Sequence, residues 1–89
     1  MYIQVTIITW DEPKRLANIE QHAMDFADLT DAFFLTAVIR PSYGGRFLAI
    51  GLLNGERVTA VVYRSLGSEA FSIVSMRPAN VQERRLFNG

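Results

Sequence analysis

Residues 46–64 read RFLAIGLLNGERVTAVVYR and carry the clearest structural signal in the chain. Two apolar runs, 46–53 and 56–64, flank the pair Asn54-Gly55. Type I′ hairpin turns prefer this pair because both turn positions need a positive φ angle. The pattern therefore predicts two antiparallel strands joined by a tight turn.

The residues after this hairpin extend the same pattern. A turn at 65–68 leads into a further strand at 70–77, which Pro78 ends. Asn80 and Glu83 have the spacing of a capping box, in which each side chain accepts a hydrogen bond from the backbone N–H of the other residue. We expect a short C-terminal helix to begin there.

The residues before the hairpin predict a strand and a helix. Residues 2–10 alternate in polarity and indicate a strand that Trp10 closes. Asp11 is of the residue type that caps helix N-termini, and the helix is expected to run to about His22. Its apolar stripe, expected to face the core, consists of Leu16, Ile19 and Ala23.

A second short helix is predicted from about Asp25, followed by a strand at 36–40 and a loop at 41–45. The fold class is therefore α+β, with an antiparallel sheet of about four to five strands, two N-terminal helices and a short C-terminal helix. At 89 residues, the chain 1–89 is expected to form a single domain.

The composition excludes several kinds of site. The chain has no cysteine, which excludes disulfides, thiolate metal sites and cysteine nucleophiles. It has one histidine, which excludes a multi-histidine metal site, so neither a metal nor another cofactor is expected. Formal net charge is zero, so any nucleic-acid site must be a local patch. The first residues lack the pattern of a signal peptide and no apolar run is long enough to span a membrane, so we expect a cytoplasmic protein.

The predicted first helix carries a polar stripe beside an aromatic residue. Lys14, Asn18 and His22 are spaced four residues apart and so share one helical face, and Trp10 directly precedes that helix. A cation, an amide and an imidazole beside an indole could bind a nucleotide. The alternative is a solvated helix face and a tryptophan that packs in the core.

Arginines stand at the ends of two predicted strands. Arg46 opens one strand and Arg77 ends another, and Arg84 follows in the last helix. A guanidinium group is a permanent charge with a fork of donors that suits phosphate. Tyr63 could stack on a base. The alternatives are that Arg46 and Arg77 pair with surface carboxylates and that Tyr63 belongs to the core.

These residues also form an ordered set of motifs. In order along the chain, the blocks are WDEPK (10–14), Asn18, His22, DFADL (25–29), RFLAIG (46–51), VVY (61–63), IVSMRPA (73–79) and ERR (83–85). In this order and spacing they resemble the BrnT family, toxins of type II toxin–antitoxin systems with a RelE-like fold. The resemblance covers nearly the whole chain.

The resemblance implies RNA cleavage without a metal, in which the 2′-hydroxyl of the RNA attacks the adjacent phosphate. It also implies a BrnA-type antitoxin as partner, RNA as substrate, and either a dimer or a toxin–antitoxin hetero-tetramer. Arg46 and Arg77 would stabilise phosphate charge, and His22 would act as acid or base because histidine exchanges protons near neutral pH. The predicted catalytic residues are thus His22, Arg46 and Arg77, and the predicted substrate-binding residues are Trp10, Lys14, Tyr63 and Arg84.

The chain departs from the family pattern at four positions. Gln21 and Ala23 stand where many members have lysine and glycine, Gly45 stands where an acidic residue is frequent, and Ser72 stands where an arginine is frequent. These losses leave open a second hypothesis, a catalytically weakened module that mainly binds its antitoxin. A third hypothesis is a structural domain that oligomerises through a sheet edge.

Overall fold

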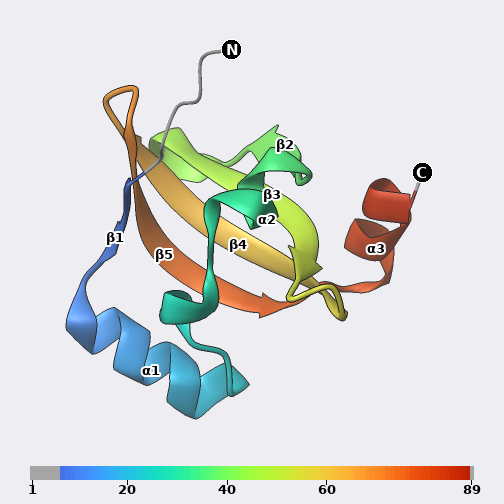
Figure 1. Cartoon of the computed structure of the whole chain (residues 1–89), viewed down its shortest axis with the longest axis horizontal. Coiled ribbons are helices and arrows are strands. Elements are labelled where there is room, and N and C mark those ends of the chain that lie inside the picture. Colours follow the sequence, from blue (N-terminus) through green and yellow to red (C-terminus); the bar gives the residue numbers. More distant parts are fainter. Residues whose placement is uncertain (1–6, 89) are drawn as a thin grey trace.

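A computed structural model describes residues 7–88 (Figure 1). The described residues form five strands, three α-helices and two short 3₁₀ turns, η1 and η2. Their bounds are β1 Ile7–Trp10, α1 Glu12–His22, η1 Phe26–Asp28, α2 Asp31–Leu35, β2 Val38–Pro41, η2 Tyr43–Gly45, β3 Arg46–Leu53, β4 Arg57–Leu66, β5 Ala70–Pro78 and α3 Val81–Asn88. The predicted strand at 2–10 is confirmed from Ile7 onward, and its first part, 2–6, lies outside the described residues.

The five strands form one sheet in the order β1-β5-β4-β3-β2. Strands β2 to β5 are antiparallel, but β1 runs parallel to β5, with Ile7 opposite Ala70. The prediction of a purely antiparallel sheet was therefore wrong, and the sheet is mixed. Short turns force antiparallel pairing only between consecutive strands, whereas β1 reaches the free edge of β5 from the other end of the chain.

The hairpin between β3 and β4 forms at the predicted place. Asn54 and Gly55 have φ angles of 53° and 71°, both positive as the turn prediction requires. The N–H of Glu56 donates to the carbonyl of Leu53 over 3.0 Å, so Glu56 belongs to the turn. Consequently β4 begins at Arg57, one residue later than predicted.

Helix α1 has the predicted extent but not the predicted inner face. Asp11 is its N-cap and His22 its last residue, yet Leu16 is 55% exposed. The buried residue is Asn18, at 5% exposure. Its Nδ2 donates to the carbonyl of Met24 over 3.0 Å, and its Oδ1 accepts from the N–H of Met76 over 3.1 Å. A polar side chain thus joins α1 to β5, so the predicted stripe of Leu16, Ile19 and Ala23 is corrected.

The helix predicted from about Asp25 is divided into η1 and α2. Asp25 is the N-cap of η1 and accepts a hydrogen bond from the N–H of Ala27 over 2.9 Å. Thr30 then has an extended backbone, with φ −131° and ψ 169°, which interrupts the helix before α2 begins. The three α-helices are therefore α1, the five-residue α2 and α3.

One face of the sheet packs against η1 and α2, as Figure 1 shows for α2 in front of β3 and β4. We call it the helix-covered face. Gly51 lets α2 approach closely, because a Cβ atom there would lie 2.9 Å from Cε2 of Phe33. The buried residues of this core are Met24, Phe26, Leu29, Phe33, Ala49, Val61, Tyr63, Ile73 and Met76.

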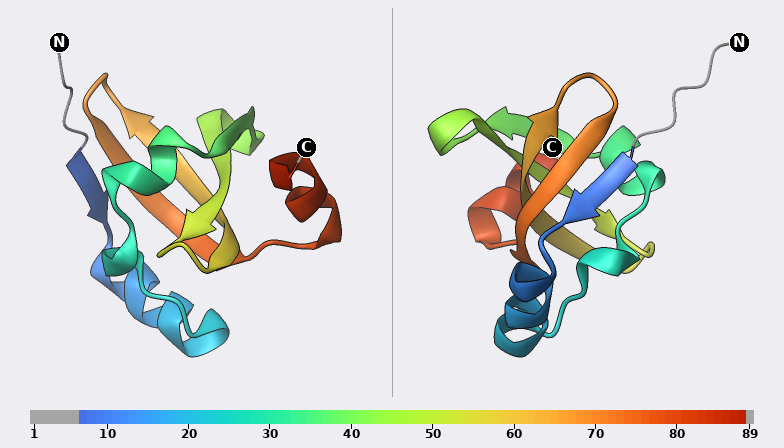
Figure 2. Two further views of the ribbon diagram at one scale, coloured as in Figure 1. Left: turned by 45° about the vertical axis from the view of Figure 1, so that its right-hand side comes forward. Right: turned by 90° about the vertical axis from the view of Figure 1, so that its left-hand side faces the viewer.

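Helix α3 lies on the other side of the strands, apart from η1 and α2 (Figure 2). It contacts β3 and β4. The predicted capping box is confirmed: the N–H of Glu83 donates to Asn80 Oδ1 over 2.8 Å, and the N–H of Asn80 donates to Glu83 Oε1 over 3.0 Å. Among residues 7–88, no helix has the length and apolar character needed to cross a bilayer.

Candidate functional site

The face of the sheet opposite the helix-covered face carries three arginines from three adjacent strands. In the register of the sheet, Arg46 of β3 is opposite Arg64 of β4, and Arg77 of β5 is opposite Ala60 of β4. Side chains alternate between faces along a strand, so Arg64 and Ala60, four residues apart, point to the same side. We call this side, with Arg46, Arg64 and Arg77, the arginine face.

A β-bulge in β5 brings Arg77 to this face. Ser72 is opposite Arg64, and in a regular strand Arg77, five residues later, would point to the other side. The register shifts at Val62 and Tyr63, so β5 holds one extra residue between these pairs and the alternation is reset. Arg77 therefore shares the face of Arg46, as the proposed phosphate site requires.

Arg77 is held by a carboxylate. Its Nη1 and Nη2 donate to Oε1 and Oε2 of Glu83 over 2.7 and 2.8 Å. The Arg77 hydrogen bonds hold the pKa of Glu83 below its usual range and outweigh the burial that would raise it. The Arg77 side chain remains 37% exposed. Arg77 thus pairs with a carboxylate, as the alternative interpretation predicted. The partner, however, is the buried helix-capping residue Glu83 and not a surface carboxylate.

Arg46 has no such partner. It is half-buried, and it takes part in none of the salt bridges among residues 7–88. Its Nε atom is buried and has no hydrogen-bond partner in the described part of the chain. The alternative interpretation, pairing with a surface carboxylate, does not hold for Arg46.

Tyr63 is on the helix-covered face. The residue is 4% exposed, and its ring centroid lies 4.5 Å from that of Phe71 and 5.3 Å from that of Phe34. This burial raises the pKa of its hydroxyl. Stacking of Tyr63 on a base, predicted from the sequence, is therefore corrected, because the ring is a core side chain.

The predicted stripe on α1 is also altered. Trp10 is half-buried, with its ring centroid 6.4 Å from that of Phe26, and its Nε1 donates to Glu12 Oε1 over 3.1 Å. The amide of Asn18 is occupied by backbone groups, whereas Lys14 is exposed. The structure thus does not assemble a free polar surface from Lys14, Asn18 and His22.

The structure does not join His22 to the arginine face. His22 is half-buried at the end of α1, and the main contact of α1 with the sheet is to β5. No hydrogen bond or ion pair among residues 7–88 links His22 to Arg46 or Arg77. Arg84, also predicted to bind substrate, is exposed on α3.

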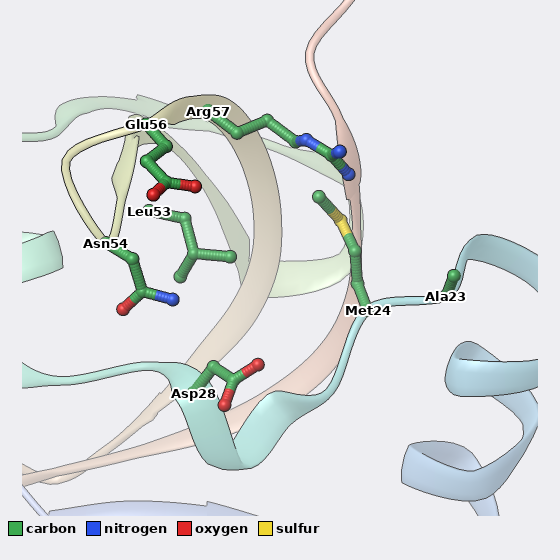
Figure 3. Close-up of a pocket in the computed structure, with 7 residues that line it drawn as sticks. All are labelled: Ala23, Met24, Asp28, Leu53, Asn54, Glu56 and Arg57. Carbon is green, nitrogen blue, oxygen red and sulfur yellow. The ribbon is translucent and has the colours of Figure 1, made fainter.

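One hollow of the surface lies on the helix-covered side. It has a volume of about 170 Å³ and is bordered by the β3–β4 turn and the segment after α1 (Figure 3). Figure 3 shows the carboxylates of Asp28 and Glu56 and the amide of Asn54 along it. None of the predicted site residues lines it. The arginine face therefore does not border this hollow, and α3 covers part of that face through contacts with β3 and β4.

Sequence reasoning missed Arg64. Predicted strands of 46–53 and 56–64 with a two-residue turn would place Tyr63 opposite Arg46. Because Glu56 joins the turn, Leu53 pairs with Arg57 and the register moves by one residue. A shift of one residue exchanges the faces of all side chains of a strand, which sends Tyr63 to the core and Arg64 to the arginine face.

Comparisons with known proteins agree with this fold. A family model described as "Ribonuclease toxin, BrnT, of type II toxin-antitoxin system" matches residues 10–83. This match places the chain in the class of ribonuclease toxins of type II toxin–antitoxin systems. The chain belongs to the BrnT family, which confirms the resemblance inferred from the motifs.

The crystal structure of the Brucella abortus ribonuclease toxin, BrnT, is similar to this chain. The two sequences are 49% identical, and the match covers 85% of this chain and 99% of that one with a TM-score of 0.81. No curated protein matches the chain. At this identity and coverage, the shared fold extends over most of the chain.

Proposed function

We propose that this chain is an active RNA endonuclease that cleaves RNA without a metal ion and acts in the cytoplasm as the toxin of a toxin–antitoxin pair. The observation that carries the proposal is the arginine face, on which Arg46, Arg64 and Arg77 from three strands share one side of the sheet. Membership of a ribonuclease toxin family supports the same reaction class.

The chemistry proposed is intramolecular transfer at phosphorus. The 2′-hydroxyl of a ribose gives up its proton, and its oxygen attacks the adjacent phosphorus. The bond to the 5′-oxygen breaks, and that oxygen takes up a proton. The products are a 2′,3′-cyclic phosphate and a 5′-hydroxyl, so atoms and charge balance without a co-reactant.

In this proposal the arginines stabilise the charge that builds up on the phosphate oxygens. Glu83 holds the Arg77 guanidinium by two hydrogen bonds, so its position is set before RNA binds. His22, at the end of α1 and without a hydrogen bond or ion pair to the arginine face among the described residues, is assigned the proton transfer on residue type alone, because histidine exchanges protons near neutral pH. The exposed Lys14 and Arg84 are assigned contacts with more distant phosphates.

A cleavage assay in EDTA tests the proposal. Purified protein should cut RNA and leave 2′,3′-cyclic phosphate ends, and Arg77→Ala should lower the rate by about 100- to 1000-fold, the effect expected for removing one preorganised donor to a developing oxyanion. Arg57→Ala is the matched control, since Arg57 is exposed on β4 but on the opposite side from Arg64.

Two results would contradict the proposal. One is intact RNA after incubation with folded wild-type protein. The other is cleavage that Arg77→Ala and His22→Ala leave unchanged. If only His22→Ala is without effect, the assignment of proton transfer to His22 fails while the role of the arginines stands.

We also propose that a BrnA-type antitoxin neutralises the toxin, with either a dimer or a toxin–antitoxin hetero-tetramer as the assembly. Membership of a type II toxin–antitoxin family supports an antitoxin partner. Expression of the toxin alone should arrest bacterial growth, and co-expression of the adjacent reading frame should restore it. Normal growth in both cases would contradict the pairing.

A second candidate function is a weakened module that mainly binds its antitoxin. The observation that favours it is the neutral Ser72 next to Arg64 in the sheet register, together with Gly45 just before Arg46. It predicts a stable complex with the antitoxin and no RNA cleavage. Detection of a cyclic-phosphate product from the purified protein would exclude it.

A further inference from the structure

Two positive charges lie side by side on the arginine face. Arg46 and Arg64 are direct partners in the antiparallel register of β3 and β4. The Cα atoms of such partners are roughly 4.5–5.5 Å apart, so their side chains leave the sheet as immediate neighbours. Like charges in directly opposite positions destabilise a sheet, so this pair needs an explanation.

No acid on the described part of the chain balances this pair. The salt bridges among residues 7–88 involve Arg15 and Arg77, and neither Arg46 nor Arg64 takes part in them. The next residue across the sheet from Arg64 is Ser72, which is neutral. The buried Arg46 Nε also lacks an acceptor, and buried donors in folded proteins nearly always have one.

We propose that Arg46 and Arg64 together form a binding site for a phosphate group, which in the working protein is a phosphodiester of the RNA strand. The inference rests on the proposed function and assigns to Arg64 a role in substrate binding. A phosphate would accept hydrogen bonds from both guanidinium groups and would offset the repulsion between them.

The Arg46–Arg64 pair lies at some distance from Arg77 on the arginine face. Arg77 is opposite Ala60, four residues along β4 from Arg64. At about 3.4 Å per residue, the two positions are about 14 Å apart along the strand, so the Arg46–Arg64 pair and Arg77 approach the RNA from different points of the face. In this proposal the Arg46–Arg64 pair fixes how the RNA strand lies across the sheet relative to Arg77.

The test compares Arg64→Gln with Arg57→Gln in the full chain. Both residues are exposed arginines of β4 that form no salt bridge with a described residue, and they lie on opposite faces. The ligand is a 2′-O-methyl oligonucleotide, which has the phosphates of RNA but no 2′-hydroxyl to react. Affinity is measured across a range of salt concentrations.

Arg64→Gln should weaken binding about tenfold, the effect of losing one charge-assisted hydrogen-bonded contact. It should also reduce the slope of log affinity against log salt by about 0.7, the value for one phosphate contact on a single strand. Arg57→Gln should change neither. Equal losses in both variants, or no loss in Arg64→Gln, would overturn the inference.

Two further arms separate this inference from the proposed function. If wild type and Arg64→Gln cleave RNA with the same KM, the Arg64 inference fails and the nuclease stands. If the wild type neither binds nor cuts RNA, but inorganic phosphate shifts the Nε–H NMR signals of Arg46 and Arg64, the phosphate site stands and the nuclease fails. A glutamate-rich peptide that binds more tightly than the oligonucleotide, with the same dependence on Arg64, would overturn the assignment to phosphate.

Discussion

The two faces of the sheet are built from the same strands and have opposite chemistry. On the helix-covered face, the ring of Tyr63 packs among those of Phe34, Phe47 and Phe71. On the arginine face, neighbouring positions of the same strands carry Arg46 and Arg64. Tyr63 and Arg64 are adjacent in sequence, so a single peptide bond separates the core from the charged surface.

The difference shows which residues serve stability and which are left for a ligand. The aromatic rings have partners within the chain, and their burial supplies free energy of folding. The Arg46–Arg64 pair has no acid among the described residues and includes a donor without an acceptor. Substitutions on the helix-covered face should therefore lower the free energy of unfolding. Substitutions on the arginine face should lower the affinity for RNA and the rate of its cleavage.

The largest expected effect on stability is that of Tyr63→Ala. Removing a buried aromatic ring should lower the free energy of unfolding by about 3–5 kcal/mol, measured by urea denaturation. Tyr43→Ala is the control, because Tyr43 is 90% exposed and its loss should change stability by no more than about 0.5 kcal/mol. Similar effects of the two substitutions would contradict the division between the faces.

A smaller effect is expected from pH, through the link between α3 and the sheet. The pKa of Glu83 is lowered in the folded state, first by hydrogen bonds from Arg77. A lowered carboxyl pKa adds stability above the unfolded value of 4.5, and this stability is lost as pH falls below it. With allowance for the screening of the exposed Arg77, the loss should be about 1 kcal/mol between pH 6 and pH 3.

Glu83→Gln is the comparison for this measurement. Its free energy of unfolding should fall less than that of the wild type over the same pH range. The pKa of Asp25, lowered chiefly by its hydrogen bond with Arg15, adds an acid-dependent loss that both proteins share. Identical pH profiles would show that Glu83 does not stabilise the fold through its charge.

The smallest effect concerns the end of α1. Ala23 has a left-handed backbone, with φ 55° and ψ 33°, a conformation that glycine adopts at less cost. Ala23→Gly should raise the free energy of unfolding by about 0.5–1 kcal/mol, measured by thermal or urea unfolding, and should leave RNA cleavage unchanged. Destabilisation by a similar amount would show that the left-handed conformation of residue 23 is not present in solution.

Local signals in the sequence predicted local structure. Asn54-Gly55 located the hairpin turn, and Asn80 with Glu83 located the start of α3, because these signals act over two to four residues. The parallel position of β1 and the inward Asn18 were not predictable, since both depend on contacts across more than fifty residues. The RelE-like classification stays a prediction.

The candidate site was predicted in part. The strand-end arginines Arg46 and Arg77 do share a face, but one extra residue in the hairpin turn and one in the β5 bulge decide this. Neither insertion has a clear signature in the sequence. Because Glu56 belongs to the turn, Tyr63 points into the core and Arg64 points to the surface. The wrong assignment of Tyr63 and the missed Arg64 therefore both result from the strand register and not from the residue types.

The most direct test is the single-turnover rate of RNA cleavage in EDTA by Arg46→Gln and Tyr63→Phe, one substitution on each face. Arg46→Gln should slow cleavage by about 100-fold with little change in unfolding, and Tyr63→Phe should cleave at the wild-type rate. Wild-type cleavage by Arg46→Gln would contradict the assignment of RNA to the arginine face.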